Sequence, residues 1–189
     1  MANNKLSGGD YLLLLLYLGD CKPINGAVRL TKMMFLFDKE IQPKLTKKGL
    51  GSDKLPDFLA YNFGPFSKDL YELVDFFSNT EFIKITTGQA EEMGEVDDWN
   101  GEWIDEAYNE INCGININSK CVKYELNKRG VNYVEKKIIP KLTDVQRKIL
   151  EQFKTKIVKT TVKDILRYVY TKYPSYAENS IIKKDVMGA

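Results

Sequence analysis

The segment YNFGPFSKDLYELVDFF, residues 61–77, constrains the fold of this chain more than any other part of the sequence. Gly64 permits a backbone turn that other residues avoid, and the fixed φ of Pro65 suits the first position of a helix. Apolar residues then recur at helical spacing on one stripe: Phe66, Leu70, Leu73, Val74 and Phe77. We therefore expect an oriented helix that begins at Pro65, with one packed side and one displayed side.

Two earlier segments also predict helices. Residues 10–18 are apolar almost all round, with Asp10 as the expected N-cap, and residues 26–41 repeat apolar side chains at helical spacing. Pro43 is expected to end the second helix, and a connecting loop follows it. The chain before Asp10 is expected to be flexible.

Short strands and further helices are expected in the rest of the chain. Residues 81–87 and 121–126 predict two strands, because the second alternates apolar and polar side chains with a period of two. The expected C-terminal helices cover residues 131–142, 143–159 and 161–174, after which the tail is expected to be loosely held. Thr143 and Thr161 resemble the first residues of capping boxes.

The residue types present exclude several kinds of chemistry. The chain contains no histidine, and its three cysteines, Cys21, Cys113 and Cys121, form no Cys-x-x-Cys pair. These features disfavour zinc sites and remove every histidine-based mechanism. No phosphate-binding loop or nucleophile elbow is present either. We therefore expect a protein that is not an enzyme and that holds no metal or cofactor.

The longest apolar run is short. It covers eight residues, Tyr11 to Leu18, whereas about 20 are needed to cross a bilayer. A basic leader with a small-residue cleavage site is also missing near the start of the sequence. The expectation is a cytoplasmic protein without a membrane segment.

Charge is distributed unevenly along the chain. Residues 1–60 carry nine basic and six acidic groups, residues 61–112 carry two and 13, and residues 113–189 carry 17 and seven. Residues 88–119 lie between the two expected strands as an acidic insert. This asymmetry predicts either a footprint for a polyanion or an insert that docks on basic helices of this chain or of a partner. The alternative is two solvated faces of opposite sign.

The order of helices and strands is that of a winged helix-turn-helix domain. The pair GAVRLTKMMFLFDKE and FLAYNFGPFSKDLYELVDFF resembles the YwgA-like and Panacea (SocA-like antitoxin) families, in which an aromatic-Gly-Pro element precedes a helix. YELNKRG, residues 124–130, is similar to the last wing strand and following turn of winged-helix regulators. The resemblance covers residues 10–85 and 121–135, and it implies a non-enzymatic role in toxin neutralisation or DNA-linked regulation.

The fold class expected from these observations is α+β and mainly α. A winged helix-turn-helix-like core is expected over residues 8–130, including the acidic insert. A C-terminal helical segment, residues 131–174, is expected to pack on this core or to pair with a second copy in a homodimer.

Two functions are open at this stage, and the first is DNA binding. The expected contacts are cations of the wing strand and the next helix: Lys120, Lys123, Lys128, Arg129, Lys136 and Lys137. Further cations follow on the next helical segment: Arg147, Lys148, Lys154, Lys156 and Lys159. The helix after Pro65 is acidic, which disfavours its entry into a DNA groove.

The second function is an antitoxin-like module that binds a partner protein. Its expected contacts lie on the displayed side of the helix after Pro65: Lys68, Tyr71, Glu72 and Phe76. A tyrosine-rich segment further on, residues 165–176, could stack on single-stranded nucleic acid, but its apolar stripe favours core packing.

Overall fold

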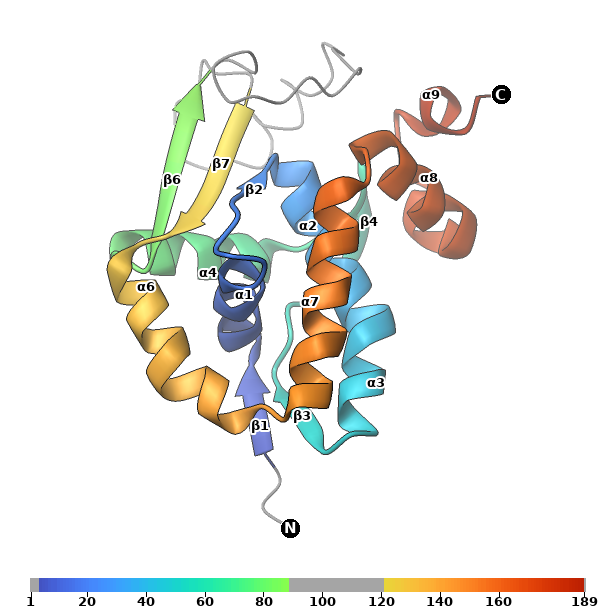
Figure 1. The fold of residues 1–189 in the computed structure, drawn as a ribbon. Coiled ribbons are helices and arrows are strands. Elements are labelled where there is room, and N and C mark those ends of the chain that lie inside the picture. Colours follow the sequence, from blue (N-terminus) through green and yellow to red (C-terminus); the bar gives the residue numbers. More distant parts are fainter. Residues whose placement is uncertain (1–3, 89–120, 189) are drawn as a thin grey trace.

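The computed structural model describes residues 4–88 and 121–188, and it confirms an α+β protein that is mainly helical (Figure 1). The helices are α1 (Gly8–Tyr17), α2 (Ala27–Leu36), α3 (Gln42–Thr46), α4 (Lys68–Asn79), α6 (Lys128–Tyr133), α7 (Asp144–Lys159), α8 (Val162–Lys172) and α9 (Lys183–Met187). Irregular helical turns are η1 (Phe37–Ile41), η2 (Val134–Ile138), η3 (Ile139–Lys141) and η4 (Pro174–Ala177). The strands are β1 (Asn4–Ser7), β2 (Ile24–Asn25), β3 (Leu50–Asp53), β4 (Leu59–Tyr61), β5 (Gly64–Phe66), β6 (Ile83–Gly88) and β7 (Cys121–Leu126).

The largest described sheet has three antiparallel strands in the order β2-β7-β6. Both strands predicted around residues 83 and 124 are confirmed, and they pair with Ile85 opposite Tyr124. Ile24 of β2 pairs with Tyr124 from the other side. Val122 and Tyr124 are buried, as the alternating pattern of β7 predicts.

Two small sheets flank this arrangement. β1 pairs with β3 in parallel, and β4 forms an antiparallel hairpin with β5. The expectation of a flexible start and a plain loop after Pro43 is therefore wrong for residues 4–7 and 50–53. Leu6 and Leu50 are fully buried, so this pairing covers one edge of the core.

The N-terminus of α1 carries a reciprocal cap. Ser7, and not Asp10, is the N-cap, which corrects the prediction by one turn. The Asp10 N–H donates to Ser7 Oγ at 3.0 Å, and the Ser7 N–H donates to Asp10 Oδ2 at 2.9 Å. Residues 11–16 are all buried, as their apolar composition predicts.

The helical path continues through Pro43, so the prediction that this proline ends a helix is wrong. α2 runs through the π turn η1 into α3, which contains Pro43. At the end of η1, the Gln42 N–H donates to the Phe37 carbonyl five residues back. A proline ring normally clashes with the carbonyl four residues back, and the wider π turn relieves that clash.

The same device occurs at Pro140. There the Ile139 N–H donates to the Val134 carbonyl at the end of η2. Both π turns end on the same hexapeptide pattern, Ile-x-Pro-Lys-Leu-Thr, at residues 41–46 and 138–143. This short repeat was missed at the level of sequence.

The C-terminal helices complete the core. Thr143 forms a full capping box with Gln146 at the start of α7, as predicted, whereas Thr161 caps α8 through its hydroxyl alone, without the reciprocal bond of a capping box. The tail beyond Pro174 is not loosely held. Its buried side chains are Ala177, Ile182 and Val186, all exposed by 2% or less.

No helix in the described part of the chain is long and apolar enough to span a membrane.

Candidate functional site

The Gly-Pro joint differs from its prediction. Pro65 does not begin a helix, because Gly64–Phe66 forms β5 and pairs with β4. Ser67 is the N-cap of α4, and its hydroxyl accepts a hydrogen bond from the Leu70 N–H at 3.2 Å. The rigid dipeptide therefore forms one arm of a hairpin, and the helix starts three residues after Pro65.

Tyr71 was predicted to lie on the displayed side of α4, and this placement is wrong. Its side chain is 8% exposed, and its ring stacks on Phe66 at a centroid distance of 5.6 Å. Its hydroxyl lies 2.7 Å from Thr31 Oγ1 and donates to the Ala27 carbonyl at 3.3 Å. Tyr71 therefore fixes α4 on α2 and is not available to a partner.

The other three predicted partner contacts lie on the surface of α4. Lys68 and Glu72 are exposed and form an ion pair at 3.3 Å, and Phe76 is 58% exposed. An exposed ion pair of this kind contributes little to stability. The exposed aromatic ring of Phe76 is the feature of this face that suits protein contact.

The predicted DNA contacts fall into two groups in the structure, and the side chains of the first group are held by contacts within the protein. Lys120 lies outside the described residues. Lys123 pairs with Glu125 at 3.2 Å. Arg129 donates to the Thr80 carbonyl at 3.0 Å and lies 4.8 Å from the centre of the Phe82 ring, so its guanidinium joins α6 to the end of α4.

Lys128, Lys136 and Lys137 form the second group. All three are exposed, and none forms an ion pair with another described residue. They lie on α6 and η2, where their amines face water. These lysines are the predicted contacts whose charge is most available to a polyanion.

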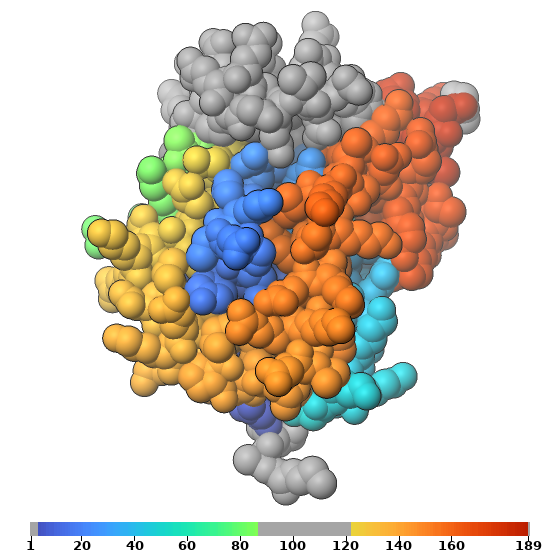
Figure 2. Space-filling view, viewed as in Figure 1, coloured from blue at the N-terminus to red at the C-terminus, as the bar shows by residue number. Residues whose placement is uncertain are grey.

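Exposed cations also continue along α7. We define the basic face as the exposed cations of residues 128–159: Lys128, Arg129, Lys136, Lys137, Lys141, Arg147, Lys148, Lys156 and Lys159. Only three carboxylates share this segment: Glu135, Asp144 and Glu151. Figure 2 shows these yellow and orange helices over much of one side of the molecule.

Lys154 was expected among these surface cations, but it is 1% exposed. Its ammonium donates to the Leu15 carbonyl at 2.6 Å and to the Lys22 carbonyl at 3.0 Å. It therefore caps the C-terminal end of α1, where a cation also complements the helix dipole. Burial lowers the pKa of Lys154 to about 7.

Arg29 of α2 is buried in a similar way. It is 4% exposed, and it donates to the carbonyls of Ile157 and Thr160 at the C-terminal end of α7. α2 therefore caps α7, and α7 caps α1. Figure 1 shows α1 between α6 and α7, which is consistent with these contacts.

Lys32 is the third buried cation of the described residues, and it was missed at the level of sequence. It is 3% exposed, and its ammonium donates to the Pro65 carbonyl at 2.9 Å. Burial lowers the pKa of Lys32 to about 7. Its spacing of four from both Val28 and Leu36 places it on a buried stripe of α2, and that spacing was the available signal.

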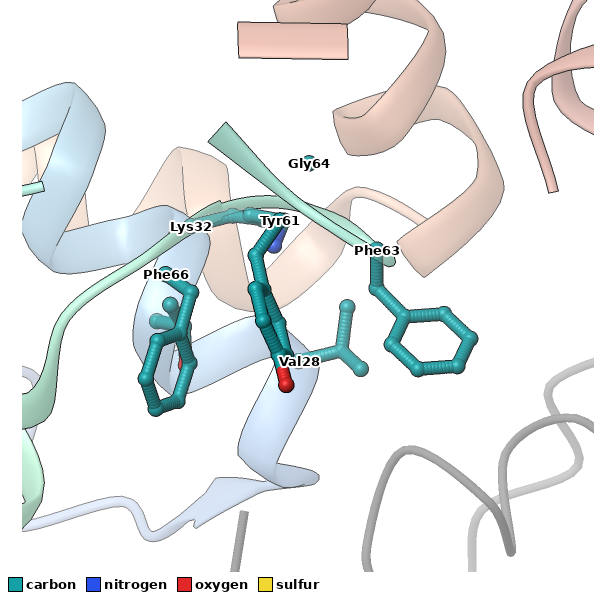
Figure 3. Close-up of a pocket in the computed structure, with 7 residues that line it drawn as sticks. Val28, Lys32, Tyr61, Phe63, Gly64 and Phe66 are labelled. Atoms are coloured by element: carbon teal, nitrogen blue, oxygen red, sulfur yellow. The ribbon is translucent and has the colours of Figure 1, made fainter. Parts of the chain in front are cut away.

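Lys32 lines a small cavity beside the Gly-Pro hairpin (Figure 3). The cavity volume is about 10 Å³, roughly the space for one water molecule. Its lining residues are Val28, Thr31, Lys32, Tyr61, Phe63, Gly64 and Phe66. Tyr61 is 41% exposed, and its ring centroid lies 5.2 Å from that of Phe66.

The tyrosine-rich segment packs mainly as a core stripe, as the apolar spacing of α8 indicates. Tyr170 is 2% exposed, and its hydroxyl shares a hydrogen bond with Ser180 Oγ at 2.8 Å. The neighbouring Tyr168 and Tyr173 donate to the Glu40 carboxylate, at 2.8 and 3.1 Å. These hydroxyls join α8 to η1.

Metal-ligating side chains do not cluster within residues 4–88 and 121–188. The acidic insert lies outside those ranges. Comparison of the sequence with protein-family models and with curated proteins gives no match.

Proposed function

We propose that this chain is a non-catalytic, winged-helix-like regulator that binds duplex DNA through the basic face. The observation that carries the proposal is the composition of that face, in which nine exposed cations stand against three carboxylates. Phosphates supply most of the affinity of such interfaces, and each lysine that neutralises one releases counterions.

The order of the elements supports the winged-helix part of the proposal. A short strand, β2, lies between α1 and α2, and the pair β6–β7 follows α4. β2 completes a three-stranded antiparallel sheet with that pair. Winged helix-turn-helix domains place a second recognition helix and a β wing against DNA.

In this chain α4 is assigned to the scaffold and not to groove reading. Its segment from Lys68 to Glu81 carries one cation and four carboxylates, so its surface repels phosphates. DNA would instead lie along α6, η2 and α7, and on η2 Lys136 and Lys137 are free of ion pairs to described residues.

The first prediction concerns the double variant Lys136→Gln, Lys137→Gln. Affinity for a random-sequence duplex should fall at least about fivefold, and the slope of log K against log salt should become shallower by about 2. Fluorescence anisotropy between about 50 and 200 mM salt measures both quantities.

The matched control is the double variant Lys183→Gln, Lys184→Gln. These lysines are also adjacent and exposed on a helix, α9, which lies far from α6 in Figure 1. The control should bind duplex DNA as the wild type does. Equal losses in the two double variants would indicate a nonspecific charge effect and reject the basic face.

A second candidate is the antitoxin-like protein-interaction module that the family resemblance implies. One observation favours it, namely the exposed Phe76 on an acidic helix. The variant Phe76→Ala should then lose a partner that the tagged wild type retains from its own host, while Val145→Ala, whose side chain is 54% exposed on α7, retains it. Retention by both variants would refute this candidate.

A further inference from the structure

The three buried cations of the described residues differ in what satisfies them. Arg29 and Lys154 each donate to two carbonyls, and these include the C-terminal ends of helices. Lys32 donates to a single carbonyl, that of Pro65, which belongs to a strand. An ammonium has three donors, so two donors of Lys32 have no acceptor among the described residues.

Lys32 also lines the small cavity beside the Gly-Pro hairpin. Figure 3 shows its side chain extending behind the hairpin toward the base of Tyr61, with Phe66 and Phe63 on either side of the Tyr61 ring. No carboxylate of residues 4–88 and 121–188 lines this cavity, so the positive charge of Lys32 has no counter-ion there from the described part of the chain. A buried charge without a partner is costly, and an entering anion would remove that cost.

We propose that this cavity binds a carboxylate carried on an aromatic or apolar stem, with one carboxylate oxygen accepting a hydrogen bond from Lys32 Nζ and the stem lying against Tyr61 and Phe66.

The dimensions of the site support this ligand class. A cavity of about 10 Å³ admits one oxygen-sized group, so the rest of the ligand must lie at the mouth. The mouth offers aromatic surface, since Tyr61 is partly exposed and its ring lies near that of Phe66. A phosphate would bring three further polar oxygens to walls that supply one cation, which favours the carboxylate.

The lowered pKa of Lys32 agrees with a site in which its amine has no partner of opposite charge among the described residues. Burial lowers the pKa of Lys32 to about 7, so the amine is partly neutral at physiological pH. A bound carboxylate favours the charged form and should therefore raise this pKa. Tyr61 is the other titratable side chain in the lining.

The test uses the full-length protein with ¹³C- and ¹⁵N-labelled lysine, observed by NMR at pH 7. Phenylacetate is the probe, and phenylacetamide is its neutral counterpart of the same shape. We expect a saturable shift of the Lys32 side-chain signals and an upward shift of its pKa with phenylacetate alone. Equal responses to phenylacetate and phenylacetamide would overturn the proposal. It would also be overturned if neither phenylacetate nor the free-acid peptide introduced below gave a response.

Two variants separate the pocket from buried lysines in general. Lys32→Met should weaken phenylacetate binding at least about tenfold. Lys154→Met removes a lysine with a similarly lowered pKa that is not part of the lining of this cavity, and it should bind within about a factor of two of the wild type. If Lys32→Met fails to fold, the pKa response of the wild type still decides the question.

A further arm distinguishes the two sources of such a carboxylate. A short peptide that ends in a free Phe carboxylate is compared with the same peptide as its C-terminal amide, and both are compared with phenylacetate. Tighter binding of the free-acid peptide identifies a protein terminus as the source, whereas tighter binding of phenylacetate identifies a small organic acid. Because DNA binding is measured separately, failure here leaves the proposed function untouched.

Discussion

At the scale of single residues, the hairpin beside α4 depends on Gly64. Its φ of +84° lies in the left-handed region, and a Cβ there would lie 2.7 Å from Cε1 of Tyr170. Gly49 has a similar φ of +83°, but a Cβ there would meet nothing within 4 Å. The two glycines therefore separate backbone strain from steric conflict.

A pair of glycine variants uses this contrast. Gly49→Ala should cost about 1 kcal/mol of unfolding free energy, because alanine is strained at positive φ. Gly64→Ala should cost about 2 kcal/mol more, because the Tyr170 ring must also move. Chemical denaturation measures both, and equal losses would show that the ring moves freely.

Single-residue roles were the hardest to predict from sequence. Tyr71 follows Leu70 at the edge of the apolar stripe of α4, and its burial depends on Thr31, which lies 40 positions away. Lys32 was overlooked because lysine is normally exposed, and its burial follows from helices that cover α2 on several sides. The contact of Tyr71 with Thr31 leaves no local pattern in the sequence, whereas the burial of Lys32 left one signal, its spacing of four from Val28 and Leu36.

At the scale of elements, features that depend on neighbouring residues were predicted correctly from the sequence, whereas pairings between distant segments were not. The caps at Thr143 and Thr161 and the alternation of β7 depend on a few neighbouring residues, and all are confirmed. The pairing of β1 with β3 joins residues more than 40 positions apart, so no local pattern predicts it. The winged-helix assignment itself stays a prediction.

The capping box of α7 gives a test at the scale of a single helix. Thr143→Ala removes the hydroxyl that accepts the Gln146 N–H, and it should cost about 1 kcal/mol of unfolding free energy. Thr155→Ala, at an exposed position inside the same helix, should be neutral or slightly stabilising. A loss at Thr155 as large as that at Thr143 would contradict the capping role.

At the scale of the whole molecule, the core crosses the boundary expected at residue 130. Buried side chains come from both sides, and they include Leu15 and Phe37 before it and Leu150 and Leu166 after it. Burial of apolar surface is cooperative, so we expect the described parts to unfold in a single transition.

The pH dependence of stability is a further whole-molecule property. Lys32 and Lys154 have pKa values of about 7 in the folded protein and an ordinary value of 10.5. Between these values the unfolded state binds more protons, so the unfolding free energy rises with pH by about 1 kcal/mol per unit for each lysine. This gain is lost again as the pH falls through 7.

Denaturation at several values from pH 7 to 8.5 measures this slope. At higher pH, the raised pKa of the Cys21 thiol makes the unfolding free energy fall as the pH rises, so the pH range of the measurement ends at 8.5. Lys154→Met should reduce the slope by about half, whereas Lys156→Met, on the exposed side of the same helix, should leave it unchanged. A flat profile in the wild type would show that the buried amines do not titrate in this range.

The mutual capping of α1, α2 and α7 has a consequence for synthesis on the ribosome. The Leu15 carbonyl accepts a hydrogen bond from the Lys154 ammonium, which is synthesised 139 residues later. Arg29 donates to the end of α7, at a carbonyl 128 residues further along the chain. At a translation rate of roughly 5–20 residues per second, these groups of the nascent N-terminal half lack their partners for roughly 6 to 28 seconds. A chain truncated before residue 154 should therefore be degraded by proteases, and chaperones should not enable it to fold.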